Sequence, residues 1–220
     1  MSVLTSNILL KLLSTRELVI SPILSDHQIQ EVSIDLRLGN VALVARARGL
    51  PHVDPTDYQS TQITDAHRHE QGKRQKLERH EILFRQPLLL HPNILTLVPT
   101  LEWLKLPMNL MGVVTARSSW AREGLNIATA NFINPGYNGI ITLELCNLGQ
   151  IPITIYPGMR IAQIAFYTIN AEEKENELIY KKSQFDMSFE PRAGDITQHD
   201  NAFIPKFPKQ NERRRQTSNK

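Results

Sequence analysis

The residues best suited to chemistry lie between positions 115 and 164. Arg117, Ser118 and Ser119 place a guanidinium and two hydroxyls directly before a short run, WARE, that stops at Gly124. Serine is a favoured N-cap and glycine a favoured residue just past a helix end, so one to two turns of helix are expected here. A helix N-terminus offers unpaired N–H groups and the positive end of a dipole, which together suit a phosphate. The cluster is therefore a candidate oxyanion site.

A carboxylate stands inside an apolar run farther along the chain. The segment IITLELCNLG is rich in β-branched residues, which predicts a strand, and Glu144 lies between Leu143 and Leu145. By alternation, Glu144 either faces solvent or is held in a pocket. A desolvated carboxylate close to a water molecule can act first as a general base and then as a general acid. The strand pattern by itself favours the solvent-facing alternative.

Motifs in this stretch resemble those of the dCTP deaminase family, within the larger dUTPase-like superfamily. The family blocks R-S-S-x-x-R, T-A-x-x-I-D-P-G, T-L-E-L and P-G-M-x-I-x-Q follow each other in the same order here. Upstream, residues 33–39 are similar to the family's S-x-D-x-R-L-G. The resemblance covers roughly residues 1–50 and 82–185. The matching residues are Arg117, Ser118, Ser119, Arg122, Thr129, Ala130, Asn134, Pro135, Gly136, Thr142, Leu143, Glu144, Leu145, Pro157, Gly158, Met159 and Gln163.

The resemblance implies roles for individual residues. Glu144, at the T-L-E-L position, is the expected proton shuttle, and Ser118 and Arg122 are expected beside the reacting base as further catalytic groups. The implied ligands are dCTP and dUTP, with Mg²⁺ carried by the triphosphate and dTTP as an inhibitor. The expected nucleotide-binding residues are Arg117, Ser118, Ser119, Arg122, Ala130, Asn134, Thr142, Leu143, Glu144, Gln163, Tyr180 and Gln184.

The expected fold is mainly β. Short strand-like runs separated by Pro and Gly turns fill residues 83–166, and no helical stretch there is long enough for a parallel-sheet crossover. An antiparallel, distorted jelly-roll-like barrel with a few short helices is therefore the expected architecture. The resemblance adds the dUTPase-like type of barrel and a homotrimer, because family sites are built at subunit interfaces. An apolar stripe over residues 6–18 predicts an N-terminal helix.

The domain organisation is expected to be one domain with two additions. Residues 1–185 form the deaminase-like β domain, and residues 49–81 within it are a polar insertion with helical turns around residues 72–83. Residues 186–220 form an extension with a partly disordered basic tail. His67 and His69, with Asp65 nearby, are expected to be solvated and not to bind a metal. In the segment 33–39, alternation predicts a half-buried strand with Asp35 and Arg37 on its solvated face, whereas the resemblance implies a structural role for these two residues.

The single cysteine, Cys146, limits the chemistry. Zinc-dependent nucleobase deaminases need a P-C-x-x-C pair and a further His or Cys ligand, so deamination by this chain must activate water without zinc. One cysteine also excludes an internal disulfide framework and fits a reducing cytoplasm. No apolar run reaches the length of a membrane span. The formal net charge of +3 is too small to indicate a specific nucleic-acid partner.

Departures from the family pattern keep two alternatives open. The family aspartate of I-D-P-G is Asn134 here, which keeps hydrogen-bonding capacity but loses the charge. The segment between Arg122 and Asn134 is one residue shorter than usual, and the Tyr180–Gln184 segment is only similar to the family's K-Y-x-x-Q. The first alternative is a dUTP diphosphatase or a bifunctional deaminase and diphosphatase. The second is a catalytically weakened nucleotide-binding regulator on the same fold.

Overall fold

The structure is a computed structural model that describes residues 2–46, 77–128, 131–169 and 184–194. Residues 1–45 and 77–193 form one compact unit, which carries every element described below. The remaining residues, 46–76 and 194–220, group separately, and only Arg46 and Gly194 of them are described. The predicted insertion and basic tail, together with His67 and His69, therefore lie almost entirely outside the described residues.

Strands dominate the described chain, and every pairing between the strands named here is antiparallel. A six-stranded sheet has the order β4-β3-β6-β10-β8, with β1 also paired to β6. Its strands are β1 (Val19–Ser21), β3 (Val41–Ala45), β4 (Leu77–Glu81), β6 (Thr96–Lys105), β8 (Leu125–Ile127) and β10 (Asn138–Asn147). The expected mainly β, antiparallel fold is confirmed.

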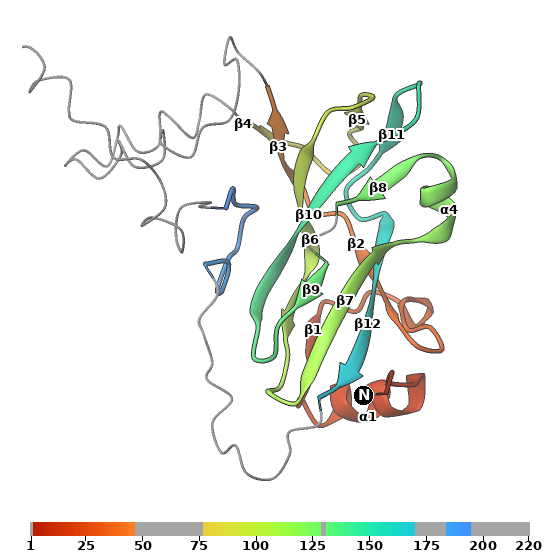
Figure 1. The fold of residues 1–220 in the computed structure, drawn as a ribbon, viewed down its shortest axis with the longest axis vertical. Coiled ribbons are helices and arrows are strands. Elements are labelled where there is room, and N and C mark those ends of the chain that lie inside the picture. Colours follow the sequence, from red (N-terminus) through yellow and green to blue (C-terminus); the bar gives the residue numbers. More distant parts are fainter. Residues whose placement is uncertain (1, 47–76, 129–130, 170–183, 195–220) are drawn as a thin grey trace, which may run out of the picture. The chain divides into compact units, whose positions relative to one another are not determined.

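Two further sheets complete the barrel. A four-stranded sheet has the order β2-β12-β7-β9, and a two-stranded sheet joins β11 to β5. The strands are β2 (Ile34–Arg37), β5 (Leu88–Leu90), β7 (Leu110–Ala116), β9 (Phe132–Ile133), β11 (Ile153–Ile155) and β12 (Arg160–Thr168). Figure 1 shows α4 (Ser118–Arg122) between β7 and β8. In the same view α1 (Ser6–Ser14) lies by the opposite end of β7.

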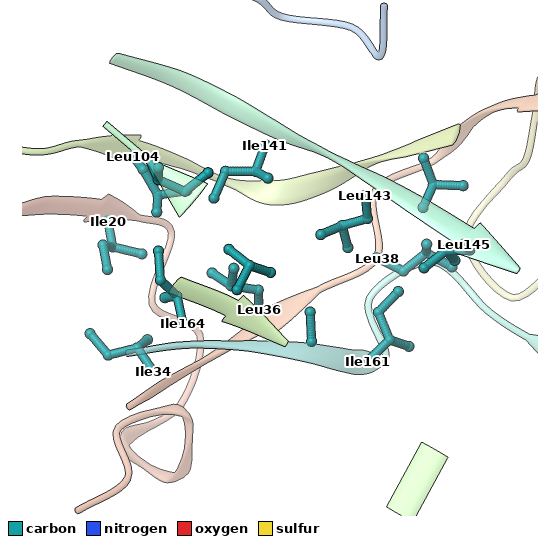
Figure 2. Close-up of a cluster of buried hydrophobic side chains, with 14 of the residues drawn as sticks. Ile20, Ile34, Leu36, Leu38, Leu104, Ile141, Leu143, Leu145, Ile161 and Ile164 are labelled. Carbon is teal, nitrogen blue, oxygen red and sulfur yellow. The ribbon is translucent and has the colours of Figure 1, made fainter. Parts of the chain in front are cut away.

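The core lies between the six-stranded and four-stranded sheets. Figure 2 shows Ile141, Leu143 and Leu145 of β10 on one side, facing side chains of β2 and β12 on the other. Because side chains alternate along a strand, these residues point inward while Thr142 and Glu144 point to the other face of β10. The fully buried members include Leu9, Leu18, Ile34, Leu36, Leu38, Leu90, Leu104, Leu145, Ile155, Ile161, Ile164 and Phe166.

The N-terminal helix forms as the apolar stripe predicts, but it is shorter. It spans Ser6–Ser14, and within it only Leu9 is fully buried, whereas Ile8 is 45% exposed. The backbone N–H of Leu4 donates to the carbonyl of Phe166, which attaches the start of the chain to β12. Of the described helices, none is long and apolar enough to cross a membrane.

Two expectations about segment boundaries differ from the structure. Helical turns were expected around residues 72–83, but Leu77–Glu81 forms strand β4, paired with β3 over its whole length. At the other end, the compact unit extends to residue 193 and not to residue 185. Met187 donates its N–H to the carbonyl of Asn138, and Phe189 packs on Trp103 with ring centroids 4.7 Å apart. In both places, contacts with distant segments hold a stretch whose own sequence has no clear helix or strand periodicity.

Candidate active site

The predicted helix after β7 is present as α4, and it presents its polar residues to solvent. Arg117, not a serine, occupies the N-cap, and its side chain makes no capping hydrogen bond. Gly124 follows the helix with φ of +90°, the left-handed conformation expected of a helix-terminating glycine. Ser118 and Arg122, the first and last residues of α4, are both exposed. The expected helix end is therefore correct, and the expected serine cap is wrong.

A pocket of about 700 Å³ lies beside α4, walled by that helix and by the turn before β12. Its lining combines three guanidinium groups with one carboxylate and one indole ring. This excess of positive charge suits a phosphorylated ligand, because planar guanidinium donors match phosphate oxygens. The lining residues are Arg37, Arg117, Ser119, Trp120, Glu123, Pro157, Gly158, Met159 and Arg160.

Asp35 holds two of these arginines in place from behind. It lies on β2 with 1% exposure, 3.1 Å from Arg117 Nε and 3.2 Å from Arg160 Nη1. The Arg160 contact is a hydrogen bond, whereas the Arg117 contact is close enough for an ion pair but not aligned for a hydrogen bond. Burial raises the pKa of Asp35, and the two guanidiniums oppose that shift. The solvated strand face that alternation suggests for Asp35 is not observed.

Backbone contacts tie α4 to β12 at the same place. The indole Nε1 of Trp120 donates to the carbonyl of Arg160 at 3.1 Å, and the N–H of Arg117 donates to the carbonyl of Ile161 at 3.1 Å. Asp35, Gln163 and Thr115 are direct neighbours across β2, β12 and β7, and Gln163 Nε2 donates to Thr115 Oγ1 at 3.2 Å. The expected nucleotide residue Gln163 is thus on the strand that carries Arg160.

Glu144 lies on the face of β10 that points away from the core. Its side chain is half-buried, and burial raises its pKa. In the part of the chain that the structure describes, its carboxylate makes no hydrogen bond or ion pair, whereas its backbone carbonyl accepts from the N–H of Ala128 at 2.8 Å. A desolvated carboxylate with no protein partner is available to a substrate, which is the arrangement a general base needs.

The other predicted site residues are distributed unevenly. Thr142 shares the outward face of β10 with Glu144, but the side chain of Leu143 is in the core at 1% exposure, so only its backbone is available. Asn134 is exposed, and its carbonyl accepts the N–H of Tyr137 at 3.2 Å in the turn after β9. Gln184 is exposed at the start of the described C-terminal segment. Ala130 and Tyr180 lie outside the described residues.

The structure brings some of the predicted residues together and leaves others apart. Arg117 and Ser119 line one pocket, close to the strand that carries Gln163. Among the described residues, Glu144 makes no hydrogen bond or ion pair with Ser118 or Arg122, although the family motif places them at one site. The structure therefore shows no direct bond between Glu144 and the polar groups of α4 within the described chain.

Sequence reasoning missed several residues of the pocket. Arg37, Trp120 and Arg160 line it, and Asp35 supports it, but none of them is among the expected nucleotide-binding residues. A signal for three of them was present: Asp35 and Arg37 fall inside the S-x-D-x-R-L-G segment, and Arg160 follows the Pro157–Met159 turn directly. No local signal in the sequence distinguishes Trp120.

Comparison with a solved structure shows which kind of protein has this fold. The crystal structure of 2′-deoxycytidine 5′-triphosphate deaminase from Agrobacterium tumefaciens matches with a TM-score of 0.56 and 26% sequence identity. The match covers 77% of this chain and 48% of that one, so this chain spans about half the length of the Agrobacterium chain. The antiparallel barrel is thus of the kind found in a nucleotide deaminase.

Sequence comparison gives the family. The family model for dCTP deaminase-like proteins matches residues 3–169. A protein from Dictyoglomus turgidum named "dCTP deaminase, dUMP-forming" is 40% identical over 163 residues, which covers 73% of this chain and 77% of that one. One from Halorubrum lacusprofundi named "dCTP deaminase" is 33% identical over 188 residues, covering 84% and 86%. This chain belongs to the dCTP deaminase-like family.

Proposed function

We propose that this protein is a dCTP deaminase that hydrolyses the 4-amino group of cytosine. The oxygen of water bonds to C4, the bond from C4 to the amino nitrogen breaks, and dUTP and ammonia leave. The observation that carries this proposal is Glu144, a half-buried carboxylate without a protein partner within the described chain, at the family's T-L-E-L position. Its raised pKa favours the proton uptake that the reaction needs.

Glu144 moves the protons in this mechanism. As a carboxylate it accepts a proton from the attacking water, and as a carboxylic acid it returns that proton to the ring or to the leaving nitrogen. Ser118 and Arg122 hold the water and stabilise charge on the base. Both are exposed on α4 and make no side-chain hydrogen bond within the described chain, so they are available to a ligand.

The triphosphate is assigned to the arginine-lined pocket. Arg37, Arg117 and Arg160 supply positive charge, and Ser119 adds a hydroxyl at the same wall. Mg²⁺ enters as part of the nucleotide substrate, since a triphosphate carries the ion with few protein ligands. Because dTTP has the same sugar and triphosphate but no 4-amino group, we infer that it competes as an inhibitor. We place the reaction in the cytoplasm, which suits a nucleotide enzyme whose one cysteine, Cys146, is a free thiol.

A second product is favoured by the names of relatives. The Dictyoglomus turgidum protein is named "dCTP deaminase, dUMP-forming". For this chain, forming dUMP from dCTP would require a second hydrolysis that releases diphosphate in addition to the deamination. One residue argues against this second hydrolysis. The family aspartate that would activate water for the cleavage of dUTP is replaced here by Asn134, which is exposed in a turn. Replacing Asn134 with Asp restores the charge, and we expect it to increase dUMP formation from dCTP. Equal dUMP yields from wild type and N134D would show that this position does not control the second step.

We infer that the active enzyme is a homotrimer with sites shared between subunits. The resemblance supports this inference, because sites of the deaminase family are built at subunit interfaces. The polar side chains of Ser118 and Arg122 on α4 are exposed, so they are accessible to a second copy. Sedimentation or light scattering that gave a monomer with full activity would contradict this assembly.

One incubation tests the activity. Purified protein is mixed with dCTP and Mg²⁺, and the reaction is separated into dCTP, dUTP and dUMP while released ammonia is measured. Ammonia equal to the sum of dUTP and dUMP is the expected result. Binding of dCTP without ammonia release would instead support a nucleotide-binding regulator. In a parallel incubation with dUTP, formation of dUMP by a protein that leaves dCTP unchanged would support a diphosphatase.

A further inference from the structure

A second glutamate, Glu102, is buried behind the arginine-lined pocket, and its environment differs from that of Glu144. Glu102 lies on β6 with 0% exposure, and both of its carboxylate oxygens accept hydrogen bonds. Oε1 accepts from Gln28 Nε2 at 3.0 Å, and Oε2 accepts from the backbone N–H of Arg37 at 2.9 Å. A charge-bearing group is costly to bury unless its hydrogen bonds are satisfied, so these two donors account for its position.

The residues that donate hydrogen bonds to Glu102 are themselves hydrogen-bonded to residues that line the pocket. Gln28 turns its Oε1 to Arg37, which donates from Nε at 3.0 Å, and the same guanidinium donates from Nη1 to the carbonyl of Gly158 at 2.7 Å. Arg37 and Gly158 both line the pocket. The chain Glu102–Gln28–Arg37–Gly158 therefore connects the buried carboxylate to the surface that faces the ligand.

The pattern of donors requires an acceptor with two oxygens at position 102. Gln28 already accepts from the Leu24 N–H at 2.9 Å and from Arg37 Nε, so its amide cannot be turned over without losing both bonds. Its NH₂ group must then donate toward Glu102 and the carbonyl of Asp35. A glutamine at 102 has one oxygen and one NH₂, so one of the two donors would face another donor.

The rest of the network fixes the strand and not the arginine. Thr100 Oγ1 donates to the carbonyl of Glu102 at 2.8 Å and accepts from the N–H of Ile141 at 3.0 Å. Thr100 is 2% exposed and has no bond to Arg37 or Gln28 within the described residues. It therefore offers a matched control, because its loss weakens the same strand without releasing the guanidinium.

We propose that Glu102 is a positioning residue, which through Gln28 holds the guanidinium of Arg37 against Gly158 so that it faces the nucleotide phosphates. The proposal rests on the assignment of the triphosphate to this pocket. Glu102 itself touches no substrate. A guanidinium fixed in advance loses less conformational freedom on binding than a free one, so its contribution appears in affinity and not in the chemical step.

The test combines kinetics with direct binding. E102Q is expected to raise the KM for dCTP and the dissociation constant of dCTP by about tenfold, the effect of one lost charge-assisted hydrogen bond, with kcat changed less than about threefold. The exchange variant E102Q/Q28E restores an acceptor for the Arg37 N–H and for Arg37 Nε. It gives up the bond to the Asp35 carbonyl, which then faces a carboxylate oxygen, and it leaves one N–H of the amide at position 102 without a protein acceptor, so we expect it to recover only part of the lost affinity, at least about threefold.

T100V provides the comparison. It is expected to lower the melting temperature while leaving KM and the dissociation constant within about twofold of wild type. An equal rise in KM for T100V, or an E102Q variant with lower stability and unchanged dCTP affinity, would overturn the positioning role. If wild type binds dCTP without deaminating it, the proposed function fails while the dissociation constants still decide this inference. If wild type does not bind dCTP, both fail.

Discussion

Buried and half-buried carboxylates in this protein differ in what surrounds them. Asp35 has a guanidinium on each side, which counteracts the effect of burial on its pKa. Glu144 has neither a cation nor a hydrogen-bond donor within the described chain, so burial alone raises its pKa. A carboxylate balanced by two arginines is suited to holding them in place, whereas an unbalanced one is suited to exchanging protons.

The first prediction concerns Glu144→Gln. The change keeps size and hydrogen-bonding capacity but removes the group that can take a proton. Turnover of dCTP is expected to fall by about a hundredfold or more, the usual contribution of a positioned general acid–base group. The affinity for dCTP should change little, because the proposed phosphate contacts are made by the arginine-lined pocket, which does not include Glu144. Steady-state kinetics and calorimetric titration measure the two effects.

A neighbour on the same face of β10 provides the control. Cys146 is half-buried like Glu144 and is not among the expected site residues, so C146A should reduce turnover far less. Comparable deamination by E144Q and wild type at saturating dCTP would rule out the proton-shuttle mechanism.

Glu102 leads to a prediction about stability and pH. Burial raises its pKa from 4.5 to about 7, although the hydrogen bonds from Arg37 and Gln28 oppose the shift. Between these values the folded protein holds the proton more tightly than the unfolded chain. The stabilisation is therefore complete below pH 4.5 and is lost as the pH rises through about 7. We expect the free energy of unfolding to fall by up to about 3 kcal/mol across this window.

The comparison with E102Q isolates the effect. Asp35 and Glu144 also have raised pKa values and titrate in both proteins, so only the difference between the two curves belongs to Glu102. Denaturant unfolding between pH 4.5 and 8 should give a difference that diminishes as the pH rises. Parallel curves for wild type and E102Q would show that Glu102 does not titrate in this range.

At the scale of elements, α4 depends on the segments that pack against it. The helix has five residues and lacks a side-chain N-cap, so its own hydrogen bonds contribute little. Trp120 ties it to β12 and Gly124 ends it against the turn at Gly149. The N–H of Leu148 donates to the carbonyl of Gly124 at 2.9 Å, which joins this end of α4 to the end of β10. Tertiary contacts, and not helix propensity, place the residues of α4.

Gly124→Ala tests this dependence. At φ of +90° any side chain is strained, and an added Cβ would lie 2.9 Å from the backbone nitrogen of Gly149. The substitution should lower the free energy of unfolding by about 2 kcal/mol and raise the KM for dCTP, because α4 must shift. Asn126→Ala, on an exposed position of the adjoining β8, is the control and should stay within about 0.5 kcal/mol. Equal stability of G124A and N126A would show that the turn can adapt.

At the scale of the whole molecule, two sheets carry the two halves of the site. Arg160 and Gln163 belong to the four-stranded sheet, whereas Glu144 belongs to the six-stranded sheet. The helix α4 is attached to both sheets, through Trp120 to β12 and through Gly124 to Leu148 at the end of β10. In the proposed trimer, Glu144 of one chain and the exposed groups of α4 of another chain would form one site.

Mixing two inactive variants tests the shared site. E144Q and R122A are each expected to lose most deaminase activity, because each variant removes a different group that the proposed site needs. If the protein is the proposed homotrimer, refolding them together in equal amounts would form mixed trimers, in which some interfaces combine an intact Glu144 with an intact Arg122. About a quarter of the wild-type activity should return if each site uses two chains and pairing is random. No recovery in the mixture, although mixed trimers form, would place every site within one chain.

The sequence by itself determined much of this protein because its information is local. Alternation along the strands separated Leu143 and Leu145 in the core from Glu144 on the outer face, and Gly124 marked the end of α4. The motif order also gave the family, which the match over residues 3–169 confirmed. These features depend on neighbouring residues, whose types restrict the backbone and the direction of each side chain.

Only the tertiary structure decided which distant residues meet. Asp35 and Arg160, 125 positions apart, come together because β2 pairs with β12, and nothing local to either residue records that pairing. The same reason explains why Asp35 is buried, although alternation placed it on a solvated face. The C-terminal residues near Phe189 have no periodic pattern, yet they pack on Trp103. Whether a residue is buried in such places depends on which distant segments pack against it. Long-range contacts decide this, and the sequence of the strand itself does not specify them.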